Sequence, residues 1–484
     1  MEPESLGLES SDNAVLPDVE CDAPGAVSFS ECSEQSCAAE LSLDCACLEG
    51  AVRAPNALVI GVISPETFGS FSGETRRIAF SGRWLDSLRL ALAEWNQELP
   101  SERLPASRRP LALLRCNSNA VLARARRAMS HLVERVQSPV VITAADDDTR
   151  AVRPRSQATN TPLICSMCYS EPAASNEASL TWPIAPPLVD QAPLAAWRAA
   201  ELAQAANPPS ADGVRTILHL SQSYPGIDEF VAEVRRRLEL AGNFHQLEVQ
   251  TPDPREQRVV QLSVAQAVIE ARPQVIVVGM DSDFTSYYLR EIERGWPDAV
   301  ARPMYVLSYM NQELGSLRES VADDDDLRAR ISGTGWALDS RVNSNLGGLA
   351  QRFERRFQQP LDQAQFGYDA FYTAAYALAW ADARAQLDGA GVARALEHSS
   401  SGASIDLGPA QLGEALARLL GGDDLDLTGT TSRLDWEPGT HATRSDVGLW
   451  CLGREPDGEL SLVSAGSPIW RAQSGEISGS YSCL

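Results

Sequence analysis

The sequence predicts an α/β protein built from two doubly wound parallel sheets. Apolar runs of strand length alternate with amphipathic helical segments along the chain, a pattern typical of parallel sheets. The chain has 484 residues, too many for one hydrophobic core, so two or three lobes are expected. The longest apolar runs have the length of strands, so we expect no membrane-spanning helix.

Strands and helices can be assigned in order through the first part of the chain. Residues 83–96 place apolar side chains at helical spacing, and residues 121–136 form a second helix with a basic face. An acidic turn at residues 146–148 can cap a third helix. The expected strands are residues 57–64, 111–115, 140–143 and 162–165, and the expected helices are residues 83–96, 121–136 and 150–159.

The alternation repeats after a proline-rich extended segment at residues 182–189, which we interpret as a hinge strand. Short apolar runs predict strands at 215–220, 246–250, 275–279, 303–308 and 331–337, and periodic segments predict helices at 191–206, 228–241, 256–271, 284–294, 343–358, 369–385 and 408–420. Residues 426–436 and 447–453 indicate an antiparallel ending. The acidic run at 323–326 is interpreted as a solvated loop, with a calcium site as the alternative.

Charge and cysteine usage limit the partners and the compartment. A net charge of −24 disfavours nucleic acid and anionic membranes as partners. The first residues lack the basic and apolar regions of a signal peptide, so either the chain is cytoplasmic or the targeting segment is not in this sequence. Five of the ten cysteines lie in the first 47 residues. We therefore interpret residues 1–56 as a Cys-rich tail or stalk, stapled by disulfides in an exported protein, with a metal site as the alternative.

Two predicted loops indicate where a ligand binds. Residues 145–149 follow one strand and residues 166–172 follow the next. In open α/β sheets, ligands bind at the carboxyl ends of strands, where loops meet helix N-termini. These two loops are therefore expected to form half of a small-molecule cleft.

Several segments together resemble a known family. The strand IGVISP, the helix ending Glu94-Trp95-Asn96, and the stretches VVITAADDDTRAV, TPLICSMCYSEP, ILHLSQSYPGIDEFVAEV and FGYDAFYTAAYALAWA occur in the order and spacing of the type I periplasmic binding proteins. The resemblance extends over some 400 residues, from about residue 57 to residue 462. It is to the branched-chain amino-acid and receptor ligand-binding branch of that family.

The resemblance implies two α/β lobes joined by a three-segment hinge, with a ligand held between them. The first lobe is expected at residues 57–186 and 340–445, and the second at 187–339 and 446–484. A small polar ligand, such as an amino acid or an amide, is expected to be captured for an ABC permease. A receptor domain that signals to a partner protein is the alternative. An enzyme is the least expected reading.

The resemblance also points to individual residues in the first-lobe loops. Hydroxyls that hold a ligand carboxylate in relatives correspond here to Asp146, Asp147, Asp148 and Thr149, of which Thr149 alone keeps a hydroxyl. Carboxylates repel a carboxylate ligand unless they are protonated or paired. The acids therefore indicate a cationic, amide or polyol ligand, or they cap the helix.

Further candidates come from both lobes. Ser166 and Ser170 match hydroxyl residues of the family, and Tyr169 matches a residue that offers its carbonyl to the ligand. Tyr224 is expected to close over the ligand from the second lobe, or to be a plain turn residue. Asp281 follows the strand at 275–279, where relatives place a group that faces the ligand ammonium.

Ser308 and Tyr309 are weaker candidates at the end of the next strand, and the arginine that relatives carry after the hinge strand is replaced within residues 183–187. For the pair Cys165 and Cys168 we expect a structural disulfide from Cys116 to one of them, with a redox or metal role as the alternative. No catalytic motif, metal site or cofactor site is found.

Overall fold

A computed structural model gives the fold of the chain. It describes residues 27–28, 41–42, 44–50, 56–65, 67–69, 75–77, 79–97, 109–170, 180–206, 214–242, 244–251, 258–281, 284–312, 314–321, 324–454, 458 and 460–483. Most of the predicted tail, including Cys21, Cys32 and Cys37, therefore lies outside the described residues.

The first sheet contains seven strands in the order β1-β2-β6-β3-β7-β8-β9. Their bounds are β1 Val27–Ser28, β2 Cys47–Gly50, β3 Leu58–Ser64, β6 Leu111–Asn117, β7 Val141–Ala145, β8 Leu163–Met167 and β9 Thr181–Pro183. Strands β6, β3, β7, β8 and β9 are parallel, while β1 and β2 add an antiparallel edge. This edge comes from the segment that the sequence assigned to the tail.

The second sheet contains eight strands in the order β11-β10-β12-β13-β14-β17-β18-β19. Their bounds are β10 Arg215–Gln222, β11 Phe244–Thr251, β12 Val275–Gly279, β13 Met304–Leu307, β14 Ile331–Trp336, β17 Val447–Arg454, β18 Leu460–Trp470 and β19 Ile477–Ser478. The first five of this order are parallel, and β17, β18 and β19 are antiparallel. The antiparallel ending expected from the sequence is therefore an extension of the second sheet.

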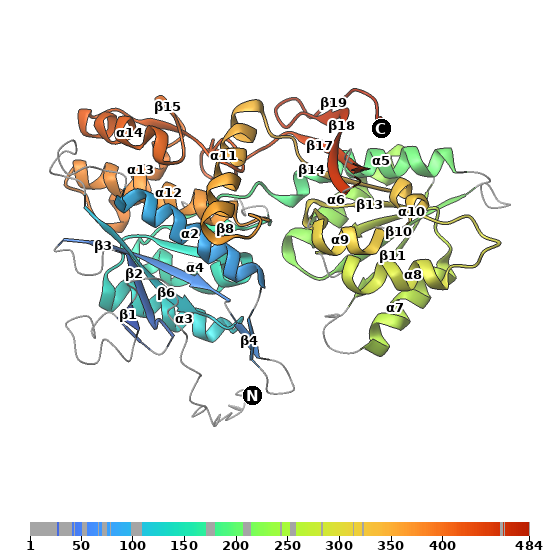
Figure 1. Cartoon of the computed structure of the whole chain (residues 1–484), viewed down its shortest axis with the longest axis horizontal. Coiled ribbons are helices and arrows are strands. Elements are labelled where there is room, and N and C mark those ends of the chain that lie inside the picture. The colour runs from blue at the N-terminus through green and yellow to red at the C-terminus, as the bar shows by residue number, and fades with distance from the viewer. Residues whose placement is uncertain are drawn as a thin grey trace, which may run out of the picture.

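Each of the two large sheets is the centre of one lobe, helices cover both sheets, and the two lobes lie side by side (Figure 1). The helices are α2 Ala79–Gln97, α3 Leu122–His131, α4 Asp146–Thr159, α5 Ala192–Ala205, α6 Pro225–Ala241, α7 Arg258–Ala271, α8 Leu289–Gly295, α9 Leu314–Val321, α10 Asp325–Arg330, α11 Ser340–Phe357, α12 Gln365–Ala383, α13 Gly389–Glu397 and α14 Pro409–Gly421. Two short strand pairs, β4–β5 (Thr67–Gly69, Thr75–Arg77) and β15–β16 (Ala403–Asp406, Leu425–Thr428), complete the described strands.

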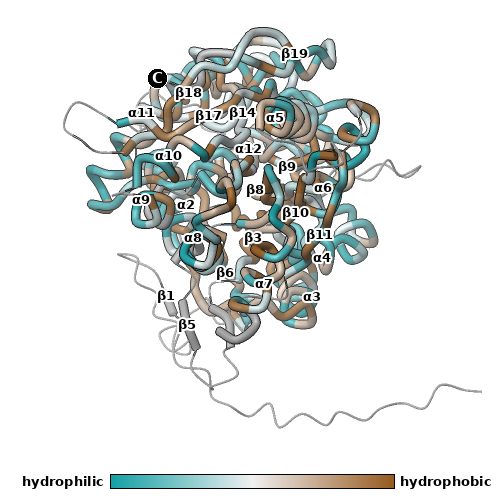
Figure 2. The backbone as a smooth tube through the Cα atoms, turned by 90° about the vertical axis from the view of Figure 1, so that its right-hand side faces the viewer, coloured by the Kyte–Doolittle hydropathy of each residue, from teal (hydrophilic) through white to brown (hydrophobic). Residues whose placement is uncertain are grey.

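The chain crosses between the lobes three times: after β9, after β14 and before β17. Together with the two doubly wound sheets, this confirms the predicted fold class. None of the described helices is long and apolar enough to span a bilayer. Hydrophobic segments gather in the central strands and hydrophilic segments lie at the periphery (Figure 2).

Helix α12 is the central helix of the first lobe. Its residues 366–378 are all buried, so the helix is covered on every side, as expected for a core helix. It packs against α2, β8 and α13. Four polar groups meet beside this interface: the hydroxyls of Tyr368 and Tyr372 both donate to Glu94 of α2, at 2.5 and 3.2 Å, and Arg352 of α11 forms an ion pair with Glu94 at 2.8 Å. Because the carboxylate is hydrogen-bonded and paired with a cation, its burial is tolerated.

An ion-pair cluster joins the edge strand β2 to the rest of the first lobe. Glu49 of β2 is 1% exposed and accepts hydrogen bonds from Arg115 of β6 at 2.5 Å and from Arg89 of α2 at 3.0 Å. The two guanidinium groups hold the pKa of Glu49 below its usual value, although burial alone acts to raise it. A charge this deeply buried requires its partners.

The predicted disulfide from Cys116 to Cys165 or Cys168 is wrong. Cys116 is bonded to Cys45, and Cys165 is bonded to Cys168. Strands β6 and β8 are separated by β3 and β7, so they lie roughly 14 Å apart at about 4.8 Å per strand. A disulfide needs Cα atoms within about 7 Å. The antiparallel edge strand β2, in contrast, brings Cys45 to Cys116.

Several predicted boundaries also move. Helix α4 begins at Asp146 rather than at residue 150, so the three acids lie in its first turn. The helix predicted at 121–136 ends at His131 and continues as a π-turn, Leu132–Val136. The strand predicted at 426–436 is shortened to β16, which pairs with β15 in a separate sheet. The acidic run was predicted to be a solvated loop, but Asp324 caps α10 by accepting a hydrogen bond from the backbone N–H of Leu327, and Asp325 and Asp326 begin that helix.

Replacement of Glu49 tests the buried ion-pair cluster. In Glu49→Ala, Arg115 remains buried without its carboxylate, so the free energy of unfolding should fall by about 3 kcal/mol. Urea-induced unfolding measures the change. The control is Glu414→Ala, which removes an exposed pair with Arg418 and should cost less than about 1 kcal/mol. Equal losses in the two variants would contradict the role given to the cluster.

Candidate functional site between the lobes

The candidate site lies where β7 and β8 end in the first lobe and α6 begins in the second. Asp146 is the first residue of α4 and follows β7 directly. Tyr169 and Ser170 follow β8, and Tyr224 precedes α6. Four of the predicted site residues are therefore brought together by loops at helix and strand ends, as expected for an open α/β sheet.

The Asp146 carboxylate is the meeting point of these residues. Its Oδ2 accepts hydrogen bonds from the backbone N–H of Tyr169 at 2.8 Å, from that of Ser170 at 3.4 Å and from the Tyr224 hydroxyl at 2.9 Å. Its Oδ1 accepts from the Ser170 hydroxyl. The side chain is buried, at 4% exposure. Asp146 thus connects both lobes through one carboxylate.

The backbone next to this carboxylate is also closely packed. The Tyr169 carbonyl, expected to face a ligand, accepts a hydrogen bond from the N–H of Leu188 at 2.8 Å. A Cβ on Gly226 would lie 2.7 Å from the Tyr169 carbonyl carbon and oxygen. The absence of a side chain at position 226 therefore allows α6 to approach the first lobe.

Four aromatic side chains from both lobes form a second group, which we call the aromatic cluster. It consists of Tyr169 and Phe366 from the first lobe and Tyr309 and Trp336 from the second. The rings of Tyr169 and Trp336 are nearly parallel with centroids 6.2 Å apart, and the Tyr309 ring lies 4.0 Å from that of Trp336. The Phe366 ring meets the other three nearly at right angles. Such pairs are favourable contacts.

Burial and negative charge affect the two tyrosines that touch Asp146. Burial raises the pKa of Tyr224 well above its usual value, and the adjacent Asp146 carboxylate raises it further. Burial raises the pKa of Tyr169 in the same way, with smaller contributions from Tyr309 and Asp146. Both phenols therefore stay protonated, and the Tyr224 hydroxyl remains a donor toward Asp146.

Asp148 and Thr149 support the site from behind. Asp148 is 3% exposed and accepts a hydrogen bond from the Ser118 hydroxyl at 3.2 Å. Burial raises the pKa of Asp148 to about 6; the Ser118 hydrogen bond lowers it and the Asp147 charge adds to the increase. The Thr149 hydroxyl donates to the carbonyl of Ala145 at 2.8 Å, so it is part of the packed helix start.

The remaining predicted residues lie around this centre. Ser166 is fully buried in β8, and its hydroxyl has no hydrogen-bond partner among the described residues. The Asp281 carbonyl accepts from the Asn311 side-chain amide at 2.7 Å, which connects the loops after β12 and β13. Ser308 and Asn311 are buried there, and within the described part of the chain the Ser308 hydroxyl and the Asn311 Oδ1 lack partners.

The Cys165–Cys168 disulfide closes the turn immediately before Tyr169. Cys165 is fully buried and Cys168 is 6% exposed. The Thr149 hydroxyl lies 3.1 Å from the Cys165 Sγ, so the turn also contacts the start of α4. The disulfide therefore fixes the short segment that presents the backbone N–H groups of Tyr169 and Ser170 to Asp146.

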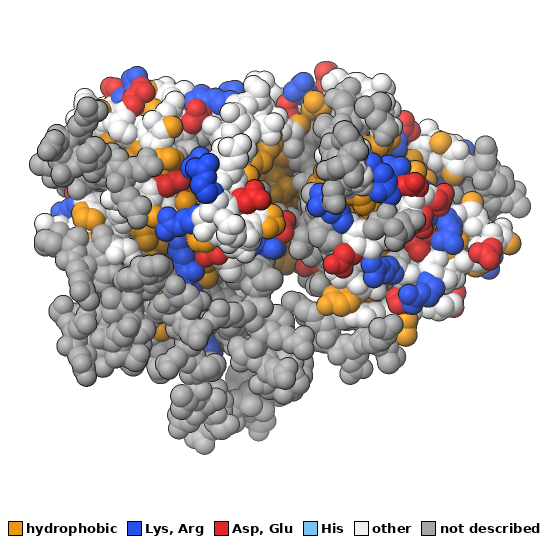
Figure 3. Space-filling view, in the orientation of Figure 1, with side chains coloured by type: hydrophobic (Ala, Val, Ile, Leu, Met, Phe, Trp, Pro, Cys, Tyr) orange, Lys and Arg blue, Asp and Glu red, His pale blue; other side chains and the backbone are white. Residues whose placement is uncertain are grey.

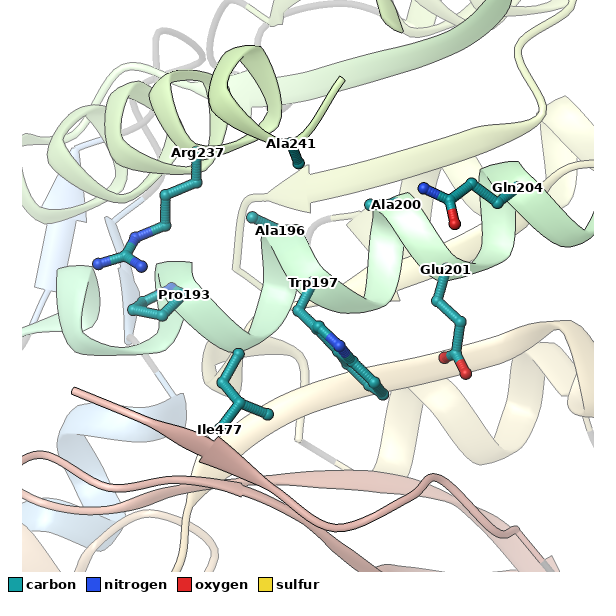
Figure 4. A pocket seen from close by; sticks show the side chains of 9 residues that line it. All are labelled: Pro193, Ala196, Trp197, Ala200, Glu201, Gln204, Arg237, Ala241 and Ile477. Atoms are coloured by element: carbon teal, nitrogen blue, oxygen red, sulfur yellow. The ribbon is translucent and has the colours of Figure 1, made fainter. Parts of the chain in front are cut away.

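The surface between the lobes is hollowed. Figure 3 shows a recess between the two halves of the molecule with hydrophobic side chains in it. A separate pocket of about 420 Å³ lies on the second lobe, among α5, the end of α6 and Ile477 of β19 (Figure 4). Its two charged residues are already engaged, Arg237 with Glu233 at 2.7 Å and Glu201 with Arg198 at 2.6 Å. We therefore place the candidate site between the lobes.

The sequence pointed to the acids, to Tyr224 and to two members of the aromatic cluster, Tyr169 and Tyr309, but not to Trp336 and Phe366. Trp336 is the last residue of β14, and Phe366 lies in the first turn of α12, in an apolar stretch typical of a core helix. Position at the end of a parallel strand was a usable signal for Trp336, because it had been applied to Tyr309. Among the described residues, no group of His, Cys, Asp or Glu side chains could hold a metal ion.

The sequence and the fold are similar to those of known binding proteins. The sequence model of the family described as periplasmic binding protein matches residues 58–411. A solute-binding protein of an ABC transporter from Rhodopseudomonas palustris BisB5, solved with 3,4-dihydroxybenzoic acid, has a TM-score of 0.63 and 13% identity, covering 86% of this chain and 98% of its own.

Two further solved structures are similar. A solute-binding protein from R. palustris, in complex with benzoate, has a TM-score of 0.56 and 13% identity, covering 87% of this chain and 98% of that one. A branched-chain amino-acid binding protein from Streptococcus pneumoniae, in complex with isoleucine, has a TM-score of 0.55 and 12% identity, covering 84% and 99%. No protein with a curated function matches the sequence.

The raised pKa of Asp148 predicts a pH dependence of stability. The folded-state pKa of about 6 lies above the ordinary value of 3.8, so the folded protein holds more protons between these values. Stability should therefore fall as the pH rises through this window, by about 1.4 kcal/mol per unit or about 3 kcal/mol in total. Asp148→Asn should lose about 3 kcal/mol less than the wild type, measured by urea unfolding from pH 3.5 to pH 7. The loss from Asp369, whose pKa is also raised to about 6 by burial, remains in both proteins. The control is Asp298→Asn at an exposed position of the second lobe, which should follow the wild type, and parallel curves for wild type and Asp148→Asn would contradict the assignment.

Proposed function

Because the chain belongs to the periplasmic binding protein family, we propose that it captures a small polar solute between its two lobes and delivers it to an ABC importer outside the cytoplasm. The proposed first lobe is residues 57–186 and 340–445, and the second is 187–339 and 446–484. The three chain crossings, after β9, after β14 and before β17, support these boundaries. The three disulfides among the described residues agree with an oxidising compartment.

The aromatic cluster is the observation that carries the proposal. Tyr169 and Phe366 belong to one lobe and Tyr309 and Trp336 to the other, so hinge opening separates the rings and exposes their faces. Aromatic faces bind flat apolar groups and organic cations. Buried clefts with a few polar groups among apolar side chains are typical small-molecule sites.

The polar groups around the cluster define the class of solute. The hydroxyl of Ser308 and the Oδ1 of Asn311 are buried without partners among the described residues, and buried polar groups of this kind normally have one. The Asn311 Oδ1 only accepts hydrogen bonds, so a bound amide N–H or ammonium group suits it, whereas the Ser308 hydroxyl can accept or donate one. Asp146 adds a negative charge beside Tyr169. We therefore favour an amide or an organic cation over a carboxylate.

The R. palustris relatives were solved with ring carboxylates, benzoate and 3,4-dihydroxybenzoic acid. An aromatic ring in the solute agrees with the aromatic cluster of this chain. A carboxylate agrees poorly with Asp146, because two carboxylates about 4 Å apart repel by about 4 kcal/mol at an effective dielectric constant of 20. The amide of such a ring acid retains the ring and removes the charge.

Matched pairs of compounds test the solute class. Benzamide against benzoate, leucinamide against leucine and choline against glycine betaine differ mainly in the carboxylate. The amide or cation of at least one pair should raise the melting temperature, while its carboxylate partner should not. At a concentration of 100 times Kd, the expected gain in the free energy of unfolding is about 2.7 kcal/mol. Trp336→Leu should weaken binding about tenfold or more, since it removes a ring face.

Trp197→Leu is the control, because Trp197 lines the outer pocket on the second lobe. If the carboxylates bind and the amides do not, the proposed solute class is wrong. If Trp197→Leu weakens binding and Trp336→Leu does not, the site lies in the outer pocket instead.

Genes for a permease and an ATPase beside this gene are expected for import, whereas a neighbouring kinase gene would assign the protein to sensing.

Closure of the lobes can be tested at Gly226. A methyl group at this position meets the Tyr169 backbone at 2.7 Å, so Gly226→Ala should hold the lobes apart and weaken solute binding at least about tenfold. Small-angle X-ray scattering should show a larger radius of gyration with an unchanged circular dichroism spectrum. Gly347→Ala, where the added methyl group meets no atom within 4 Å, is the control. An unchanged radius of gyration in Gly226→Ala would contradict this view of closure.

A further inference from the structure

Four hydrogen-bond donors converge on the side chain of Asp146. Two are backbone N–H groups, of Tyr169 and Ser170, and two are hydroxyls, of Ser170 and Tyr224. An ionised carboxylate has about four acceptor positions on its two oxygens, so these donors use its capacity. Asp146 is also the first residue of α4, and the positive end of a helix dipole favours an anion at this position.

These donors are held in place by parts of the molecule other than Asp146, so they could bind the carboxylate of another molecule as well. The two N–H groups are held by the backbone, and the Cys165–Cys168 disulfide fixes the turn before them. Tyr224 comes from the second lobe, next to Gly226, whose close approach to Tyr169 positions α6. The same donors in the same places suit the carboxylate of a small free molecule, because backbone N–H groups and hydroxyls bind any carboxylate oxygen.

We propose that these donors form a carboxylate-binding subsite between the lobes that the protein fills with its own Asp146 side chain. The wild-type chain therefore excludes solutes that need this subsite for a carboxylate. In place of such a solute, Asp146 supplies the contact between the first lobe and Tyr224. This inference deepens the proposed function and rests on it for the identity of the solute, but the subsite itself can be tested without one.

Removal of the side chain should turn the subsite into a binding site for acetate. Asp146→Gly deletes a CH2COO⁻ group, which is the size of acetate, and leaves the four donors without an acceptor. Unpaired buried donors destabilise the folded state, so this variant should melt several degrees below the wild type. Sodium acetate at about 50 mM should restore a large part of the loss, because a ligand that binds only the folded state raises its stability.

The measurement is the melting temperature in sodium acetate compared with sodium chloride at equal ionic strength. Acetate should raise the melting temperature of Asp146→Gly by at least about 3 °C and leave the wild type unchanged. Asp147→Gly is the matched control, because it places a glycine at the next, exposed position of the same helix turn. Asp146→Asn should also show no response, since its amide fills the space.

A response of all four proteins to acetate would overturn the proposal, as would no response of Asp146→Gly. If Asp146→Gly does not fold, Tyr224→Phe tests the contact between Asp146 and the second lobe instead. It removes the second-lobe donor and should increase the radius of gyration while the fold is retained. An unchanged radius of gyration in Tyr224→Phe would then overturn the role of Asp146 as the contact between the lobes.

The matched-pair panel separates this inference from the proposed function. In Asp146→Gly the preference should reverse, so that benzoate or leucine stabilises the variant and its amide does so less. If no compound binds the wild type but acetate stabilises Asp146→Gly, the solute class is wrong and the subsite stands. If an amide binds the wild type and acetate has no effect on Asp146→Gly, the proposed function stands and the subsite is wrong.

Discussion

One shared carboxylate connects the two halves of the cleft. Asp146 follows β7 and accepts hydrogen bonds from the loop after β8 and from Tyr224 before α6. The positions of the Tyr169 backbone, of Gly226 and of the aromatic cluster are all consistent with this contact. Since the carboxylate is buried, it requires hydrogen-bond donors, and three of its four come from the first lobe itself. The fourth donor, the Tyr224 hydroxyl, reaches it only when the two lobes are close, so lobe closure completes the hydrogen bonding of this carboxylate.

The fold could be predicted because its signals are local. Strands such as VIVVG and helices such as 83–96 carry their own periodicity, and their alternation allows few topologies. The exceptions are the segments whose structure is set by distant partners. Strand β2 has no pattern of its own, and its pairing with β6 depends on the Cys45–Cys116 disulfide and the Glu49–Arg115 ion pair. The same long-range pairing explains why the predicted partner of Cys116 was wrong.

The candidate site was predictable in position but not in detail. Loops at strand ends indicated Asp146, Ser170 and Tyr224, which the structure brings together. The two roles expected for the acids were ligand contact and helix capping. Neither describes a carboxylate that accepts hydrogen bonds from its own lobe and from the second lobe. Which side chain meets which donor depends on distances of a few tenths of an ångström across two lobes, and sequence spacing carries no such information. Trp336 and Phe366 were missed because a buried aromatic residue reads as core.

The covalent attachment of the edge strand has a mechanical consequence. Cys45 and Glu49 bind the strand β2 to the body of the first lobe by a disulfide and a buried ion pair. A pull on the chain before residue 45 therefore reaches the body of the first lobe through a covalent link and a buried ion pair, and the strand β2 cannot be peeled from the sheet without breaking both.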